Sequence, residues 1–235
     1  LKLFYLNICM LKMLMPFGKY KGQGLNKVFK NDKRYIEWLV TTDWYNTRFT
    51  DYAKESKKLL NDYDKNIVLS DDINIYTDGS CAFNGMKGAT CGIGIYFCET
   101  NRNKINDVSE LLLIDNPTNN YAELFAIDKA IKIVIDKDLS DKHIHLYTDS
   151  KYSIDCVTKW YEGWVKKNKF KRPNIEIIRS IYDNVQNLNI TFHHVRSHTN
   201  KNDIHSIGNS RADSLATKCV YDYLNKKTRI IDDEL

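Results

Sequence analysis

Three absences narrow the class of this protein. The six cysteines are scattered, with no Cys-x-x-Cys pair and no Cys and His spacing typical of a zinc site. No internal repeat or low-complexity tract occurs. The apolar residues 1–15 are interrupted by two lysines, are too short to span a bilayer and lack a small-residue cleavage site after them. We therefore expect an intracellular protein with reduced thiols, acting in the cytoplasm or the nucleus.

The composition is that of a globular protein with an uneven charge. The 235 residues are 43% hydrophobic, which is enough for one or two domains with real cores. The net charge is +5, and residues 1–70 hold 13 Lys and Arg against 7 Asp and Glu, whereas the remainder holds 22 against 23. A basic N-terminal third suits a polyanionic partner, although an ordinary solvated surface has the same composition.

The order of patterns predicts two domains. Residues 16–22 have the Gly and Pro punctuation of a tight hairpin, and residues 33–38 the spacing of a short amphipathic helix. We expect a small basic α+β module over residues 1–50, a linker over 51–70, a larger domain over 71–222 and a C-terminal tail over 223–235.

The larger domain alternates strand and helix patterns, which predicts an α/β fold with one mixed sheet flanked by helices. The expected strands are 73–78, 91–98, 108–114, 143–148 and 190–195, and the expected helices are 119–134, 150–160, 174–185 and 210–220.

Four carboxylates fall at the ends of these elements. Asp78 precedes a Gly-Ser break that is typical of a turn, and Asp149 closes a strand. Glu123 lies three residues after Asn120, the spacing of a capping box, and Asp213 lies in the first turn of the last expected helix. Each acid alone has a structural explanation. Together they suggest a site, because ligands bind where strands end and helices begin at one edge of an α/β sheet.

Converging carboxylates repel one another unless cations lie between them. All-oxygen ligation suits a hard ion such as Mg²⁺ or Mn²⁺. Two such ions about 3.5 to 4 Å apart can activate water and stabilise the leaving oxygen of a phosphodiester, which is the chemistry of nucleases.

Five blocks in order then carry a resemblance. Thr-Asp-Gly-Ser, Thr-Asn-Asn-x-Ala-Glu-Leu, Tyr-Thr-Asp-Ser, Val-x-x-His and Gly-Asn-x-x-Ala-Asp-x-Leu-Ala, spread over residues 73–220, resemble the signature of type 1 ribonuclease H. The resemblance implies a ribonuclease H-like five-stranded mixed sheet and endonucleolytic hydrolysis of the RNA strand of RNA/DNA hybrids, leaving 5′-phosphate and 3′-hydroxyl ends. It implies two Mg²⁺ ions, with Mn²⁺ able to substitute, held by Asp78, Glu123, Asp149 and Asp213, and a proton-transfer or product-release role for His198.

The same resemblance implies substrate contacts. Residues 159–172 resemble a basic protrusion with interleaved aromatics, and Asn116 replaces a basic member of the phosphate pocket. The implied ribose contacts are Asn84, Asn119 and Asn120, with Asn209 at the matching place before the final Asp. The implied phosphate pocket holds Thr118 and Asn174. The implied DNA-strand channel and protrusion include Tyr152, Trp160, Lys166 and Lys167. For Trp164 we expect packing instead.

Several alternatives stay open. Residues 16–22 and 35–39 resemble a compact module found beside nuclease domains in some bacterial and large-virus proteins, where it would add nucleic-acid or protein contacts or serve a structural role. Tyr121 stands where Arg is usual, and the loop over residues 198–209 is long. The expected partner is an RNA/DNA hybrid, with no membrane and a monomeric chain, in a cell or in the host of a large DNA virus. The rivals are a non-catalytic hybrid-binding protein and a related-fold nuclease for another nucleic acid.

Overall fold

The computed structural model describes residues 13–66, 68–197 and 203–233, and the chain divides into two units, residues 1–68 and 69–235. The predicted apolar opening, up to residue 12, and His198 lie outside the described residues. Across the described ranges, no helix has the length and apolar content needed to cross a membrane.

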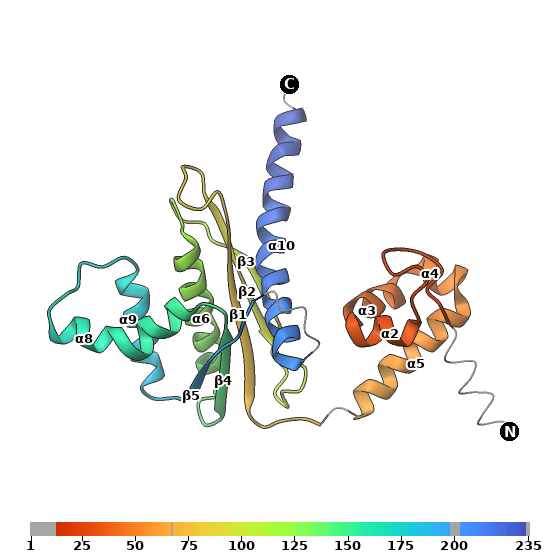
Figure 1. Cartoon of the computed structure of the whole chain (residues 1–235), viewed down its shortest axis with the longest axis horizontal. Coiled ribbons are helices and arrows are strands. Elements are labelled where there is room, and N and C mark those ends of the chain that lie inside the picture. The colour runs from red at the N-terminus through yellow and green to blue at the C-terminus, as the bar shows by residue number, and fades with distance from the viewer. Residues whose placement is uncertain (1–12, 67, 198–202, 234–235) are drawn as a thin grey trace. The chain divides into compact units, whose positions relative to one another are not determined.

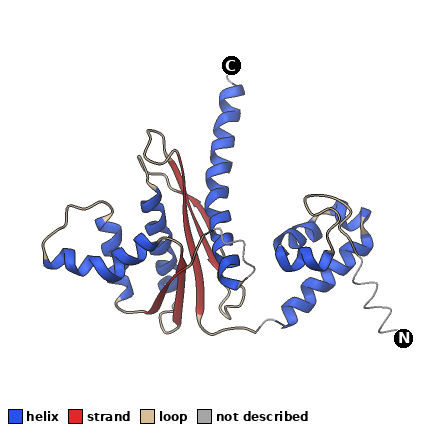
Figure 2. Ribbon diagram, in the orientation of Figure 1, coloured by secondary structure: helices blue, strands red, loops and turns tan. Residues whose placement is uncertain are grey.

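The first unit is helical in the part that the structure describes. Its helices are α2 (Leu25–Asn31), α3 (Lys33–Thr41), α4 (Asp43–Arg48) and α5 (Thr50–Asn66) (Figure 2). Among the described residues of this unit, the expected hairpin is an isolated antiparallel bridge between Leu14 and Gly24. The α+β character of the module stays a prediction. The buried core consists of Met15, Leu25, Val28, Ile36, Leu39, Tyr45 and Ala53.

The expected linker over residues 51–70 is mostly helix α5. This helix packs on α3 and α4, buries Ala53 and places Ser56 within 2.9 Å of the buried Tyr45 hydroxyl. The high charge of the segment misled the prediction, because its charged residues occupy the outer face of an amphipathic helix whose inner face is apolar.

The second unit contains the predicted sheet. Its strands are β1 (Ile73–Ala82), β2 (Thr90–Phe97), β3 (Val108–Leu111), β4 (His143–Thr148) and β5 (Asn189–His194), in the order β3-β2-β1-β4-β5. The β1–β2 and β2–β3 pairs are antiparallel, and the β1–β4 and β4–β5 pairs are parallel. The five-stranded mixed sheet is therefore confirmed.

Helices cover the two faces of this sheet. Helix α6 (Asn119–Asp136) packs on β1 and β2 from one side, and α10 (Ile204–Asp233) packs on β1, β2 and β3 from the other (Figure 1). The largest core lies between the sheet and α6, against which α9 (Ile175–Val185) also packs. The expected helix over 150–160 is α7 (Lys151–Asp155) followed by a π-helical turn (Cys156–Trp160) and α8 (Tyr161–Lys166).

The last helix is longer than the sequence pattern predicts. It begins at Ile204, where the Asp203 carboxylate accepts hydrogen bonds from the backbone N–H groups of His205 and Ser206, and it continues to Asp233. The predicted tail over residues 223–235 is therefore helical as far as Asp233. Part of the long loop expected over 198–209 is also helix.

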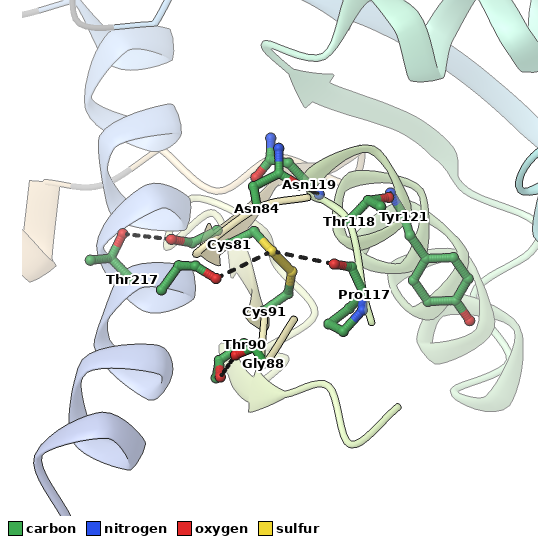
Figure 3. The surroundings of a disulfide bond; sticks show 12 residues. Cys81, Asn84, Gly88, Thr90, Cys91, Pro117, Thr118, Asn119, Tyr121 and Thr217 are labelled. Carbon is green, nitrogen blue, oxygen red and sulfur yellow. Dashed lines mark hydrogen bonds between the residues drawn. A yellow bond between two sulfur atoms is a disulfide. The ribbon is translucent and has the colours of Figure 1, made fainter. Parts of the chain in front are cut away.

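Two of the cysteines are paired rather than free. Cys81 on β1 and Cys91 on β2 are cross-strand partners with Cα atoms 4.0 Å apart, and a disulfide joins them (Figure 3). Cys98, Cys156 and Cys219 are free thiols. The expectation of reduced thiols throughout was wrong, because a ten-residue separation reveals nothing until the strand register places the two side chains opposite each other.

Candidate active site

Asp78 lies inside a strand rather than at its end. It pairs with Gly94 of β2, and only 6% of its surface is exposed. The following Gly79 does not make the predicted turn. A Cβ atom at Gly79 would lie 2.4 Å from the Glu123 backbone nitrogen, so the missing side chain allows α6 to approach β1 closely.

Glu123 reaches the same place from α6. The helix is capped by Thr118, whose hydroxyl accepts a hydrogen bond from the Tyr121 N–H at 3.3 Å, so the predicted capping box between Asn120 and Glu123 was wrong. Glu123 lies on the inner face of the helix and is 5% exposed.

Asp149 and Asp213 arrive from β4 and α10. Asp149 follows the last residue of β4 and is half-buried. The buried Asn209 of α10 donates from Nδ2 to Asp149 Oδ2 at 3.4 Å. Asp213, one turn further along α10, lies well inside the helix and not in its first turn as predicted.

The structure brings the predicted acids together. One carboxylate oxygen from each of Asp78, Glu123 and Asp149 lies within 4.8 Å of the others. Asp213 is outside that group of three but lines the same open cavity of about 490 Å³. The lining also includes Gly79, Ser80, Cys81, Asn119, Asn120, Ser150 and Ser197.

Burial and mutual repulsion favour the protonated forms of Asp78 and Glu123. Burial first, and then the charges of Asp149 and Asp213, raise the pKa of Asp78 to about 8. Burial, followed by Asp78 and Asp149, raises the pKa of Glu123 well above its ordinary value. Such shifts mark a group of anions that lacks a compensating positive charge.

A hard divalent cation fits this group. Among the residues that the structure describes, Glu123 Oε2 is buried and has no hydrogen-bond partner. An orphaned carboxylate oxygen beside two further carboxylates offers an all-oxygen ligand set, which suits Mg²⁺ or Mn²⁺ better than a softer metal.

The asparagines predicted to bind ribose lie at the edge of the cavity. Asn84 Oδ1 accepts a hydrogen bond from the Asn119 N–H at 3.1 Å, so the two are neighbours (Figure 3). Asn119 and Asn120 line the cavity itself. Asn209 is 4% exposed and contacts Asp149, so its environment is that of a residue that positions a carboxylate.

The remaining predicted substrate residues lie on the segment after β4. Trp160 is 41% exposed and forms an edge contact with Tyr152, at 6.2 Å between ring centroids. Burial raises the pKa of Tyr152, and a side-chain hydrogen bond with Asn174 opposes that rise. The backbone of Asn174 is left-handed, with a φ of 62°. Trp164 packs against the core as predicted.

The two predicted lysines of the protrusion are solvent-exposed. Lys166 Nζ lies 3.7 Å from the Glu162 carboxylate, and Lys167 is exposed as well. The phosphate pocket of Thr118 and Asn174 stays a prediction.

Sequence patterns missed several residues that line the cavity. Gly79 was interpreted as a turn residue, and Ser80, Ser150 and Ser197 were not singled out. Ser80 follows Gly79 in β1, Ser150 is the N-cap of α7, and Ser197 lies just after β5. These serines can be recognised as site residues only because they lie close to Asp78 and Asp149, and that closeness depends on the β1–β4–β5 register.

The fold and the acids define a class: a mixed α/β sheet with a group of carboxylates, able to hold a cation, that opens into a cavity. Residues 70–221 match the RNase H family. The chain belongs to that family, as the sequence blocks predicted.

Two curated relatives and one solved structure are similar to this chain. A probable ribonuclease H of Acanthamoeba polyphaga mimivirus is 40% identical over 139 residues, which cover 57% of this chain and 59% of that protein. Ribonuclease H of Schizosaccharomyces pombe is 33% identical over 209 residues, covering 86% of this chain and 71% of that protein. The prototype foamy virus protease-reverse transcriptase has a TM-score of 0.54 at 29% identity, over 64% of this chain and 21% of that chain.

The N-terminal unit has a separate match. Residues 15–41 match a family described as Exodeoxyribonuclease X-like C-terminal. The matched stretch spans the Gly-rich turn, α2 and α3. The role of this unit stays a prediction.

Proposed function

We propose that this chain is a ribonuclease H that hydrolyses the RNA strand of RNA/DNA hybrids endonucleolytically, leaving 5′-phosphate and 3′-hydroxyl ends. The observation that carries the proposal is the convergence of Asp78, Glu123 and Asp149 within 4.8 Å in a cavity that also holds Asp213. A non-catalytic binding protein would gain nothing from burying carboxylates that repel one another.

The four acids would hold two Mg²⁺ ions, which Mn²⁺ can replace. When bound, these ions supply Lewis-acid stabilisation of the charge on the scissile phosphate and lower the pKa of an attacking water. Asp78 and Glu123 are fixed by a strand and a helix that pack without an intervening side chain at Gly79, so their oxygens are preorganised. Asn209 orients Asp149 by donating to it.

Selectivity for RNA would come from the rim of the cavity. The 2′-hydroxyl distinguishes RNA from DNA because it can donate and accept a hydrogen bond. Asn119 and Asn120 line the same cavity as the carboxylates, and Asn84 contacts Asn119, which supports a role for the three in binding a ribose of the cleaved strand. Tyr152 and Trp160, with the exposed Lys166 and Lys167, would contact the DNA strand, and His198 would assist proton transfer or product release.

The test is a cleavage assay on one sequence prepared as RNA/DNA hybrid, duplex RNA and duplex DNA. We expect cleavage of the hybrid in Mg²⁺ or Mn²⁺, none in EDTA, and products with 3′-hydroxyl ends that a polymerase can extend. Binding without cleavage under all metal conditions would favour the non-catalytic alternative. Equal cleavage of duplex DNA would favour a related nuclease.

For the N-terminal unit we propose an auxiliary contact with the phosphate backbone. Lys21 and Lys27 are exposed on the unit, whose charge is positive. In the full chain, Lys21→Gln with Lys27→Gln should flatten the salt dependence of hybrid binding, since each lost phosphate contact changes the slope of log K against log salt by about 0.9. An unchanged slope would leave a structural or protein-docking role.

A further inference from the structure

We propose that the second unit carries another metal site, distinct from the carboxylate site, in which Asp72, His143 and His145 bind a transition metal of the Zn²⁺ type. One donor atom from each of these residues lies within 4.8 Å of the other two. His145 Nε2 and Asp72 Oδ2 are 3.5 Å apart, and the two imidazole rings are 4.1 Å apart between centroids.

These separations suit a zinc-sized ion. Zinc binds imidazole nitrogen at about 2.0–2.1 Å, so two ligands in tetrahedral positions lie roughly 3.3 Å apart. The 3.5 Å between His145 and Asp72 is already near that value. Two imidazoles with one carboxylate form a borderline-soft set, in contrast to the all-oxygen set around Asp78.

The strand geometry explains why the ligands meet. His143 and His145 are two residues apart on β4, so they project from the same face. Asp72 directly precedes β1, and the parallel register pairs Ile73 with Ile144 and Asn74 with His145. The start of β1 is thereby brought beside the start of β4.

The edge strand β5 orients both histidines. Nε2 of His143 lies 2.9 Å from Thr191 Oγ1, and Nδ1 of His145 lies 3.0 Å from His193 Nε2. Each bond occupies one ring nitrogen and leaves the other for a ligand. Metal-binding histidines are held in this way by a second hydrogen bond that fixes the ring and its tautomer. Thr191 and His193 are therefore positioning residues.

The site is accessible and remote from the cavity. Helix α10 packs mainly on β1, β2 and β3, and Asp72, His143 and His145 are each half-buried. His143 begins β4 and Asp149 follows its end, a separation of roughly 20 Å at about 3.3 Å per residue. A metal here would not touch the substrate phosphate. It would join the start of β1 to β4 and, through His193, steady the half-exposed edge strand.

The experiment compares Zn²⁺ binding by full-length variants in equilibrium dialysis, with Mg²⁺ in large excess to fill the carboxylate site. We expect the wild type to bind one more Zn²⁺ per chain than His143→Gln/His145→Gln. The control is His194→Gln, which removes the exposed histidine next to His193 on the opposite face of β5 and should bind as the wild type does. Equal stoichiometry in the wild type and the double variant would overturn the proposal.

A second variant tests whether the lost Zn²⁺ binding reflects loss of a ligand or misfolding of the double variant. Asp72→Asn lies outside the core and should raise the Kd for Zn²⁺ without changing the melting temperature in EDTA. Zn²⁺ should raise the melting temperature of the wild type more than that of His143→Gln/His145→Gln, because binding to the folded state alone stabilises it. If Asp72→Asn binds Zn²⁺ with wild-type affinity, the ligand assignment is refuted.

Discussion

Replacing one acid of the cavity should stabilise the metal-free protein while abolishing its activity. Asp149→Asn removes an anion that lies within 4.8 Å of both Asp78 and Glu123. Two unit charges at that separation repel by about 3.5 kcal/mol at an effective dielectric constant of about 20. Protonation of Asp78, whose pKa is raised to about 8, already relieves part of the repulsion.

We therefore expect the variant to gain about 1–2 kcal/mol in EDTA at pH 8, which for a chain of this size raises the melting temperature by roughly 2–8 °C. The gain should depend on pH with a definite sign. Because the folded pKa of Asp78 is raised from 3.8 to about 8, the native state holds a proton that the unfolded state has released between these values. Metal-free stability should fall as the pH rises through this window.

The advantage of Asp149→Asn should accordingly grow from pH 5 to pH 8, as Asp78 loses its proton and its charge begins to repel that of Asp149. Calorimetry in EDTA measures it, with the exposed Asp222→Asn as a control that should melt like the wild type. Mg²⁺ should stabilise the wild type more than the variant. A variant that melts at or below the wild-type temperature at pH 8 would refute the electrostatic account of the site.

Three further substitutions test neighbouring features. Gly79→Ala places a Cβ 2.4 Å from a backbone nitrogen of α6 and should destabilise the fold by about 1–3 kcal/mol in denaturant titrations. The control is Gly163→Ala, whose Cβ would have nothing within 4 Å and which should be neutral or stabilising by up to about 1 kcal/mol. Equal effects of the two substitutions would contradict the packing argument. Asn209→Ala should lower kcat about 10-fold or more by releasing Asp149, and an unchanged kcat would remove that role. Trp160→Ala should raise the KM for the hybrid about 5-fold, equivalent to about 1 kcal/mol, and a KM like that of the wild type would exclude Trp160 from the interface.

The strand and helix order was predictable because it rests on local periodicity. The alternation over β4 and the apolar spacing of α6 each reflect one buried face, which a short stretch of sequence displays by itself. The acids were found because each falls near the end of an expected element and within a family block. Their burial and mutual distances could not be predicted, because these depend on how β1, α6 and β4 pack.

The errors share one cause, which is that each feature depends on contacts that a local sequence pattern does not display. Gly79 looks like a turn residue until α6 is placed against it, and the start of α10 depends on the Asp203 cap, which lies outside the apolar pattern. The Cys81–Cys91 disulfide and the pairing of His145 with Asp72 depend on strand register, which no local pattern reveals.

The most direct measurement of the central claim is strand-specific cleavage of a hybrid labelled on its RNA strand, with Mg²⁺, by the wild type, Asp78→Asn and Asp222→Asn. The account predicts that the wild type and Asp222→Asn cut the RNA strand and leave the DNA strand intact, and that Asp78→Asn binds the hybrid without cutting it. Cleavage by Asp78→Asn at the wild-type rate would contradict it.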